Sequence, residues 1–392
     1  MRFATFACAG LIALVACAAD GATDRSAPPT DTDNGQGSDD GGSPVSDAGT
    51  GDADTPNLDP DAERPLACSP TGVCETRIPT SELGEPLSLR SVWVVASNDV
   101  WSVSAQGLIL HFDGTSWTTS HRTNHALYSV WATATDVWAG GERGLLLHRS
   151  AAGEWRLVET GHVQPIHAIY GTSAGDVWFS RGGAVDHFDG SKLTTLSPGI
   201  PGLRITTVFG RPGFGTYAAG HVEGPVNLDA VRVEHTPYVF ELSPTAISTF
   251  NASLTGRLTF VPVSGVATDD LDEDRRVFLF GYQDWYSELR PGYSAFGRDS
   301  SASIISTGEK AISDHVGFAP RPPSCAAWAR SWDDVRYLND VGGLLRWDGT
   351  SLTKREIDMG YSFVPRRVYG LHGNSTDMWI VGEGFALKGP TP

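Results

Sequence analysis

Short segments in which apolar and polar residues alternate follow one another along residues 87–392, and turn residues separate them. This pattern is typical of β-strands. One unit recurs: an aromatic residue such as Trp93, then Asp99-Val100-Trp101, then glycine and an apolar segment that ends in Asp113-Gly114. A period near ~40 residues built from four short strands predicts a β-propeller blade. The aromatic residues that we assign to the first strand of each blade are Trp93, Trp131, Tyr170, Phe209, Trp328 and Tyr369.

The number of blades depends on the stretch between Phe209 and Trp328. The first four aromatics are spaced by 38, 39 and 39 residues, whereas this gap spans 119 residues. Eight blades would need three degenerate copies in the gap, and seven would need two copies with insertions at 222–236 and 308–326. The expected strands favour a seven-bladed β-propeller, with eight blades as the alternative. We place these strands at 217–220, 238–242, 246–250, 258–263, 277–282, 285–289 and 303–306.

The last repeat stops after Gly384–Lys388 and lacks its outer strand. An open ring would leave two sheet edges exposed to solvent. We therefore expect an N-terminal strand, near residues 75–79, to complete the last blade.

The N-terminus reads Met1-Arg2 followed by an apolar segment over residues 3–16 and then Cys17. This segment is too short to span a membrane and indicates an export signal. Leu14-Val15-Ala16-Cys17 resembles the bacterial lipobox, which implies lipidation at Cys17 and a lipoprotein signal peptide over 1–16. An ordinary cleaved signal is the alternative. Ala18 instead of Asp favours the outer membrane or cell surface, with membrane contact through the lipid anchor only.

Charge is distributed unevenly along the chain. The 392 residues have a formal net charge of −17, and residues 18–66 contribute −10 of it, from twelve acidic residues against two arginines. A segment of this composition cannot bury a core, so we expect 17–66 to be a disordered acidic spacer. Neither part has the basic face that nucleic acids require, so we expect no nucleic-acid partner.

Cysteine spacing agrees with export. Cys68 and Cys74 bracket a short turn-rich loop and predict a disulfide in an oxidising compartment. The region 67–89 would then hold the disulfide loop and the closing strand, and 90–392 the propeller. Cys325 is expected to be a buried thiol.

The repeated residues are first interpreted as structural. Trp101, Trp138, Trp178 and Trp379 should pack against neighbouring blades. The Asp-Gly pairs predict hairpins between the third and fourth strands. The repeated His111, His148 and His187 would form hydrogen bonds within their blades and not a metal ring. The acidic tract Asp269–Asp274 lacks the spacing of a calcium loop, so we expect a solvated turn. No metal site and no cofactor is predicted.

Propellers bind ligands at the channel mouth, on loops that vary freely. Counting three residues back from each first-strand aromatic predicts that Arg90, Tyr128, His167 and Arg366 encircle that mouth. The same loops carry further basic residues, so the rim is expected to be basic and to suit an anionic ligand. These further residues are His121, Arg122, His125, His162, Arg204, His315, Arg321 and Arg367.

The sequence contains no Gly-x-Ser-x-Gly elbow, no His-Glu-x-x-His and no phosphate loop, so no enzyme activity is assigned. The repeats over 90–221 and 325–388 resemble Trp-rich, BNR-like and two-component-regulator-like propeller lipoproteins common in myxobacteria. That resemblance implies a monomeric surface scaffold that binds a protein or an acidic glycan. The alternative is a carbohydrate-active enzyme, a glycosidase or polysaccharide lyase, with its site at the channel mouth.

Overall fold

The computed structural model describes residues 66–227, 232–250, 260–268, 277–285, 288–296, 305–306, 326–338, 343–355 and 367–391. Residues 63–392 form one compact unit. The signal peptide, the lipidation site Cys17, the spacer up to residue 65, the acidic tract 269–274 and Cys325 lie outside the described residues, so their predictions stand as made.

The described strands form seven four-stranded antiparallel sheets, and six of these are built from strands that follow one another in sequence. The first three sheets follow the repeat closely. They comprise β2 (Leu89–Ala96), β3 (Asp99–Ser104), β4 (Leu108–Phe112) and β5 (Trp117–Arg122); β6 (Leu127–Ala132), β7 (Val137–Gly141), β8 (Leu146–Arg149) and β9 (Trp155–Leu157); and β10 (Ile169–Ser173), β11 (Asp176–Arg181), β12 (Ala184–Phe188) and β13 (Leu193–Leu196).

The next three sheets include the region where the repeat signal fades. They comprise β14 (Leu203–Arg211), β15 (Gly215–Asn227), β16 (Arg232–Ser243) and β17 (Ala246–Thr249); β18 (Phe260–Ala267), β19 (Val277–Trp285), β20 (Glu288–Phe296) and β21 (Ile305–Ser306); and β22 (Ala326–Ser331), β23 (Asp334–Leu338), β24 (Leu344–Trp347) and β25 (Leu352–Arg355). In the described part of the chain the one helical element is a 3₁₀ turn, Glu142–Gly144, and no helix there has the length and apolarity to cross a bilayer.

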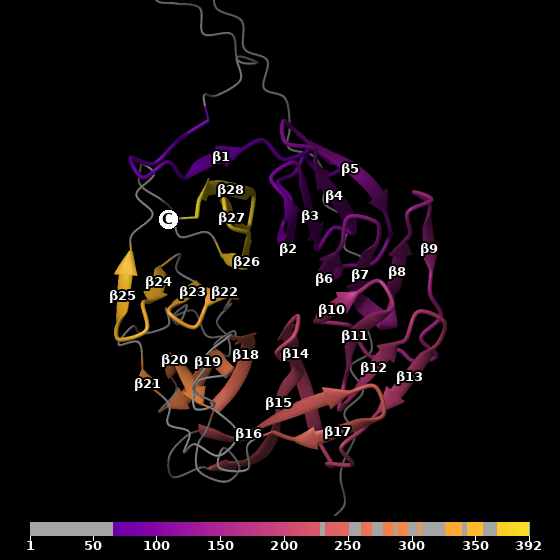
Figure 1. The fold of residues 1–392 in the computed structure, drawn as a ribbon, viewed down its shortest axis with the longest axis vertical. Helices are drawn as coiled ribbons and strands as arrows, with labels where there is room; N and C mark the ends of the chain where they lie inside the picture. Colours follow the sequence, from indigo (N-terminus) through magenta and orange to yellow (C-terminus); the bar gives the residue numbers. More distant parts are fainter. Residues whose placement is uncertain are drawn as a thin grey trace, which may run out of the picture. The chain divides into compact units, whose positions relative to one another are not determined.

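The last sheet joins the two ends of this unit. The strands β26 (Val368–Gly373), β27 (Asp377–Gly382) and β28 (Phe385–Pro390) are completed by β1 (Cys74–Thr76), with Cys74 opposite Lys388. The expected closing strand is thus confirmed. Each first strand contacts the first strand of the next sheet, and β26 contacts β2, so the sheets return to their start (Figure 1). The fold is an all-β propeller, as predicted.

The core lies between successive sheets. The second-strand tryptophans are at most 4% exposed, and each packs against the following sheet. Trp138, for example, has its ring centroid 5.2 Å from Phe179 and 5.0 Å from Phe188. Trp379 contacts Phe112 and Trp117 in the same way, across the junction between the last sheet and the first. The structural interpretation of these tryptophans is confirmed.

The strands between residues 222 and 306 differ in detail from those expected. Within the insertion at 222–236, the described residues 222–227 and 232–236 extend β15 and β16 as paired strands. The third strand of the next sheet is β20 and not 285–289, whose described residues are the last of β19 and the first two of β20. The first strand there carries Gly265 beside the ring of Phe209, where a Cβ would lie 2.4 Å from an aromatic carbon. The marker position itself, opposite the second-strand residue Phe278, holds Val266, so the aromatic signal disappears in this strand.

A disulfide joins Cys68 and Cys74, as predicted. Cys74 is also the first residue of β1, so the covalent bond fixes the start of the strand that completes the last sheet.

Candidate binding site at the channel mouth

The mouth of the channel is defined by a bulge near the start of the first strands. The register between first and second strands shifts at Arg90 in β2, Tyr128 in β6, Thr206 in β14 and Tyr369 in β26. A bulge leaves one residue unpaired and redirects its side chain. All four of these residues line one cavity of about 920 Å³, together with His167. The structure therefore brings Arg90, Tyr128 and His167 together, as counting along the repeats predicts.

The fourth predicted residue is wrongly placed by that counting. Arg366 lies outside the described residues, and the equivalent position in the last sheet is occupied by Tyr369. The register shows why: His372 lies opposite Trp379, as Trp93 lies opposite Trp101. Tyr369 is thus three residues before the true marker position. A search for the residue seven or eight positions before the second-strand tryptophan would have found His372.

Two stacked pairs line the mouth. The Arg90 guanidinium carbon lies 4.1 Å from the centroid of the Tyr369 ring, an arrangement that a cation favours. The Tyr369 hydroxyl donates a 2.7 Å hydrogen bond to Glu383 Oε1. Tyr128 stacks on His167 with ring centroids 4.9 Å apart. Burial lowers the pKa of His167, so this imidazole is neutral at pH 7 and the cation of this group is Arg90.

The extended β15–β16 hairpin adds a second cluster to the same cavity. His221 and His235 pack edge to face, 5.0 Å apart, and Arg204 lies 3.8 Å from Glu223. His221 is buried, and burial, followed by the charges of His235 and Arg204, lowers its pKa to about 4. At neutral pH the positive charge of the cluster is that of Arg204. Sequence reasoning located the insertion at 222–236 but did not select its two histidines.

Other rim residues named from the sequence do not line the cavity. His162 Nε2 donates a 3.1 Å hydrogen bond to Asp186 Oδ2 with its side chain 2% exposed, so it is a structural contact. Arg122 pairs with Glu82, and His125 lies 3.9 Å from Glu142. The expected basic, histidine-rich rim is therefore narrower than predicted, and its charge comes from arginine. His315, Arg321 and Arg366 lie outside the described residues.

A channel cavity of about 460 Å³ shares Arg90, Tyr128, His167 and Tyr369 with the mouth and is also lined by aromatic rings. His372 stacks on Trp93 with centroids 4.0 Å apart, and its Nδ1 accepts a 3.0 Å hydrogen bond from the Val94 backbone N–H. Burial lowers the pKa of His372 to about 3, so it is a neutral acceptor. Trp131 lies 6.2 Å from Trp93 on the other side. This aromatic layer forms the floor beneath the polar mouth.

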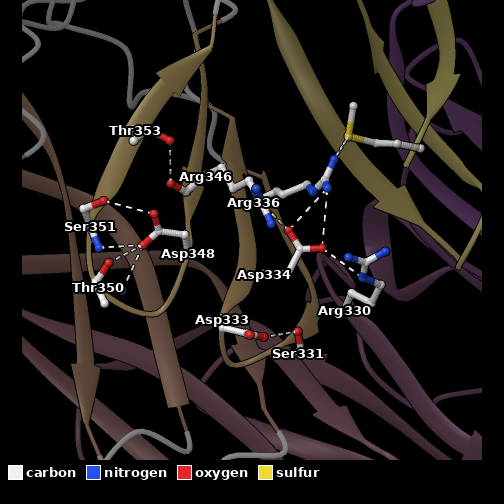
Figure 2. Close-up of polar contacts among 11 residues, drawn as sticks. Arg330, Ser331, Asp333, Asp334, Arg336, Arg346, Asp348, Thr350, Ser351 and Thr353 are labelled. Carbon is white, nitrogen blue, oxygen red and sulfur yellow. Dashed lines mark hydrogen bonds and ion pairs between the residues drawn. The ribbon is translucent and has the colours of Figure 1, made fainter. Parts of the chain in front are cut away.

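The repeated histidines are confirmed as hydrogen-bonding residues within their sheets. His111 bonds Asp99 at 3.0 Å and stacks on Trp101 with centroids 4.3 Å apart. His148 and His187 make the same bond to Asp136 and Asp176 at 2.9 and 2.7 Å. The sheet β22–β25 keeps the carboxylate, as Asp334, but holds Arg336 at the position of the second-strand tryptophan and Arg346 at the position of the histidine. Asp334 is therefore surrounded by Arg330, Arg336 and Arg346 (Figure 2).

The Asp-Gly pairs lie between third and fourth strands, as predicted. Asp113 Oδ1 accepts from the Thr115 backbone N–H at 2.8 Å and from the Ser116 N–H at 2.9 Å. These bonds and the Thr115 hydroxyl lower the pKa of Asp113 to about 2.

Comparison with known proteins gives the fold. No protein-family model and no curated protein sequence matches the chain. Solved structures do: YCF48 bound to D1 peptide has a TM-score of 0.55 at 15% identity and covers 83% of this chain and 99% of its own. The extracellular domain of a putative one-component system from B. thetaiotaomicron has a TM-score of 0.55 at 13% identity, over 80% of this chain and 39% of its own. A catalytically inactive virginiamycin B lyase from Staphylococcus aureus with quinupristin also reaches 0.55, at 11% identity, over 81% of this chain and 97% of its own. These similarities establish a β-propeller and nothing finer.

Proposed function

We propose that this protein is a non-enzymatic binding propeller whose seven sheets are seven blades and whose channel mouth takes an anionic group of a protein or glycan partner. One observation carries the proposal. The bulge in successive inner strands directs Arg90, Tyr128 and Tyr369, with His167, into one cavity of about 920 Å³. Bulges are devices that aim side chains, and core packing does not require them.

The composition of the mouth suits an acidic group carried by a larger partner. Arg90 and Arg204 supply positive charge, and the stacked rings of Tyr128 and His167 supply a flat apolar surface. Arg90 already rests on Tyr369, which holds the guanidinium in place and reduces the entropy lost on binding. The narrow aromatic floor admits a side chain or one sugar unit but not a folded domain.

Export and anchoring belong to the same proposal. The segment 1–16, Cys17 and the acidic spacer 17–66 would place residues 67–392, as a monomer, outside the cytoplasm on a lipid anchor. The Cys68–Cys74 disulfide agrees with an oxidising compartment. Metabolic labelling with a radioactive fatty acid tests it: the wild-type chain should incorporate label, and Cys17→Ser should not.

The binding function is tested with polysaccharides of opposite charge. The protein should bind alginate or heparin immobilised on a sensor surface and not bind neutral dextran. Arg90→Ala combined with His167→Ala should weaken that binding at least about tenfold, because charge-assisted contacts are lost. Arg156→Ala is the matched control, since Arg156 is exposed and its ion pair among the described residues is with Glu154. Retention of full affinity by the double variant would rule out the mouth.

A carbohydrate-active enzyme is the second candidate, and the contact between Tyr128 and neutral His167 beside the cavity favours it. A neutral imidazole near a sugar can remove a proton from it. The same polysaccharides distinguish the two functions. Release of shorter chains with time would support an enzyme, whereas saturable binding without products would support the binding module.

A further inference from the structure

We propose a second binding site, in the cleft between the sheets β2–β5 and β6–β9, for a small carboxylate-bearing saccharide that pairs with Arg149. The proposal starts from one repeated position. The residue at the end of the third strand lies against the second-strand aromatic of the preceding sheet. Phe112 meets Trp379, Phe188 meets Trp138 and Trp347 meets Phe278 in this way.

The cleft between the first two sheets departs from this rule. Register places Arg149 opposite Val137, just as Phe112 lies opposite Val100 and Phe188 opposite Val177. An arginine thus stands where three other junctions place an aromatic ring. Its guanidinium carbon lies 5.5 Å from the Trp101 ring centroid, and a cavity of about 330 Å³ remains beside it.

Arg149 is half-buried, and its guanidinium forms no ion pair or hydrogen bond with any residue that the structure describes, although it lies near the Trp101 ring. A partly desolvated cation without a carboxylate is unfavourable unless an anion joins it. The nearest acid of the cavity, Asp99, is already engaged: its Oδ1 accepts from Trp101 Nε1 at 2.7 Å and contacts His111 Nε2 at 3.0 Å. Asp99 is thus held by contacts within its own sheet, so a ligand could supply the carboxylate that would pair with Arg149.

The remaining lining indicates what carries that charge. Side chains with hydroxyl or amide groups surround the cavity: Asn98, Thr118, Ser120, Thr133 and Thr135. Such groups pair with ligand hydroxyls as donors and as acceptors. A volume of about 330 Å³ suits one saccharide unit. An acidic monosaccharide unit, a uronate, combines the single charge with several hydroxyls.

This cleft is separate from the mouth, because none of its lining residues lines the mouth cavity or the channel. The proposal is therefore independent of the proposed function, and each can fail without the other. Binding at the mouth is tested with polymers and mouth variants, whereas the cleft is tested with monosaccharides and Arg149.

Isothermal titration calorimetry of the full chain with sodium D-glucuronate, D-glucose and sodium acetate tests the assignment. Glucuronate should bind, and glucose and acetate should each bind at least about tenfold more weakly. Arg149→Met should weaken glucuronate binding by about tenfold or more, because one charge-assisted contact is lost. Arg156→Gln, on the neighbouring exposed strand, should match the wild-type protein.

A second variant guards against misfolding. Arg149→Phe restores the ring of the other junctions, so it should raise the melting temperature while abolishing glucuronate binding. Three results would overturn the proposal: no binding of glucuronate to the wild-type protein, unchanged binding to Arg149→Met, or loss of binding in Arg90→Ala. Equal affinity for acetate would overturn the saccharide assignment.

Discussion

The carboxylate of Asp334 is expected to contribute more stability than any of its counterparts in the other described sheets. Its side chain is 3% exposed and that of Arg336 is 2% exposed. Arg346 Nε lies 2.8 Å from one carboxylate oxygen and Arg330 Nε lies 3.0 Å from the other (Figure 2). Burial lowers the pKa of Arg336, which shows that its charge is poorly solvated. Asp334→Asn would leave three guanidinium groups without their shared anion.

The expected loss in the free energy of unfolding is estimated by comparing Asp334 with Asp99, which occupies the same place in the first sheet. Removing one partner of a buried ion pair destabilises a protein by about 3–5 kcal/mol, because the remaining charge stays buried and unpaired. Asp99 contacts a histidine, His111, and both side chains are more than a quarter exposed, at 26% and 29%. A neutral imidazole can donate to the amide oxygen of Asn, so Asp99→Asn should cost about 1 kcal/mol. The two variants should therefore differ by about 2–4 kcal/mol.

Urea unfolding at pH 7 measures this difference in the free energy of unfolding. Urea is preferable to guanidinium chloride, because added salt screens the charges in question. Tryptophan fluorescence and far-UV circular dichroism should give coincident transitions, which establishes that one cooperative step is compared. A double change, Asp334→Asn with Arg336→Leu, should recover part of the loss, because it removes the deepest of the unpaired charges.

Equal destabilisation by Asp334→Asn and Asp99→Asn would refute this reasoning. It would mean that the carboxylates act only as hydrogen-bond acceptors and that the surrounding arginines are effectively solvated. Failure of the double change to recover stability would lead to the same conclusion.

Three further outcomes follow from the fold. Trp138→Ala should lower the free energy of unfolding by about 3–5 kcal/mol, since the ring is 1% exposed between two sheets; a loss under 1 kcal/mol in the same urea assay would contradict its core role. Cys74→Ser opens a loop with a sequence separation of 6 and should cost about 2 kcal/mol, measured against the wild-type protein with and without reductant. Asp113 and Asp189 have pKa values lowered to about 2, so their stabilisation is present above pH 4 and is lost as the pH falls towards 2. Changing both to Asn should flatten the dependence of melting temperature on pH in that window, and an unchanged profile would show that the turns do not respond to protonation.

Much of the fold could be predicted from the sequence because each repeat places a large ring at a fixed distance from an aspartate. Trp101, Trp138 and Trp178 mark their strands in this way, and the strand that completes the last sheet follows from an incomplete final repeat. The pattern fails where packing needs no aromatic residue. In β18 the position opposite Phe278 holds Val266, so the aromatic marker is absent although the strand is present.

The candidate site could be predicted only in part. The sequence gives the residue types, but it does not always show which residues of two repeats are equivalent in the strand pairing. Arg90, Tyr128 and His167 were found by counting from aromatic markers that are truly equivalent. In the last sheet the equivalent residue is His372, an imidazole stacked on Trp93, and counting from Tyr369 selected the wrong residue. The cavity also depends on side chains from the β15–β16 hairpin, whose length the sequence suggested but whose pairing it did not specify.

The repeats preserve the contact between a carboxylate and a nitrogen-bearing side chain, although the residue that supplies the nitrogen changes. Each described carboxylate at the start of a second strand meets a nitrogen from the third strand: an imidazole in three sheets, Arg346 in the sixth and Lys388, at 3.8 Å from Asp377, in the last. Because that requirement is met locally, neighbouring positions are free to depart from the repeat. Arg149 departs where an apolar ring is usual, and it serves no carboxylate of its own sheet, which His148 already satisfies. A cation that the fold does not need is the feature that a ligand would explain.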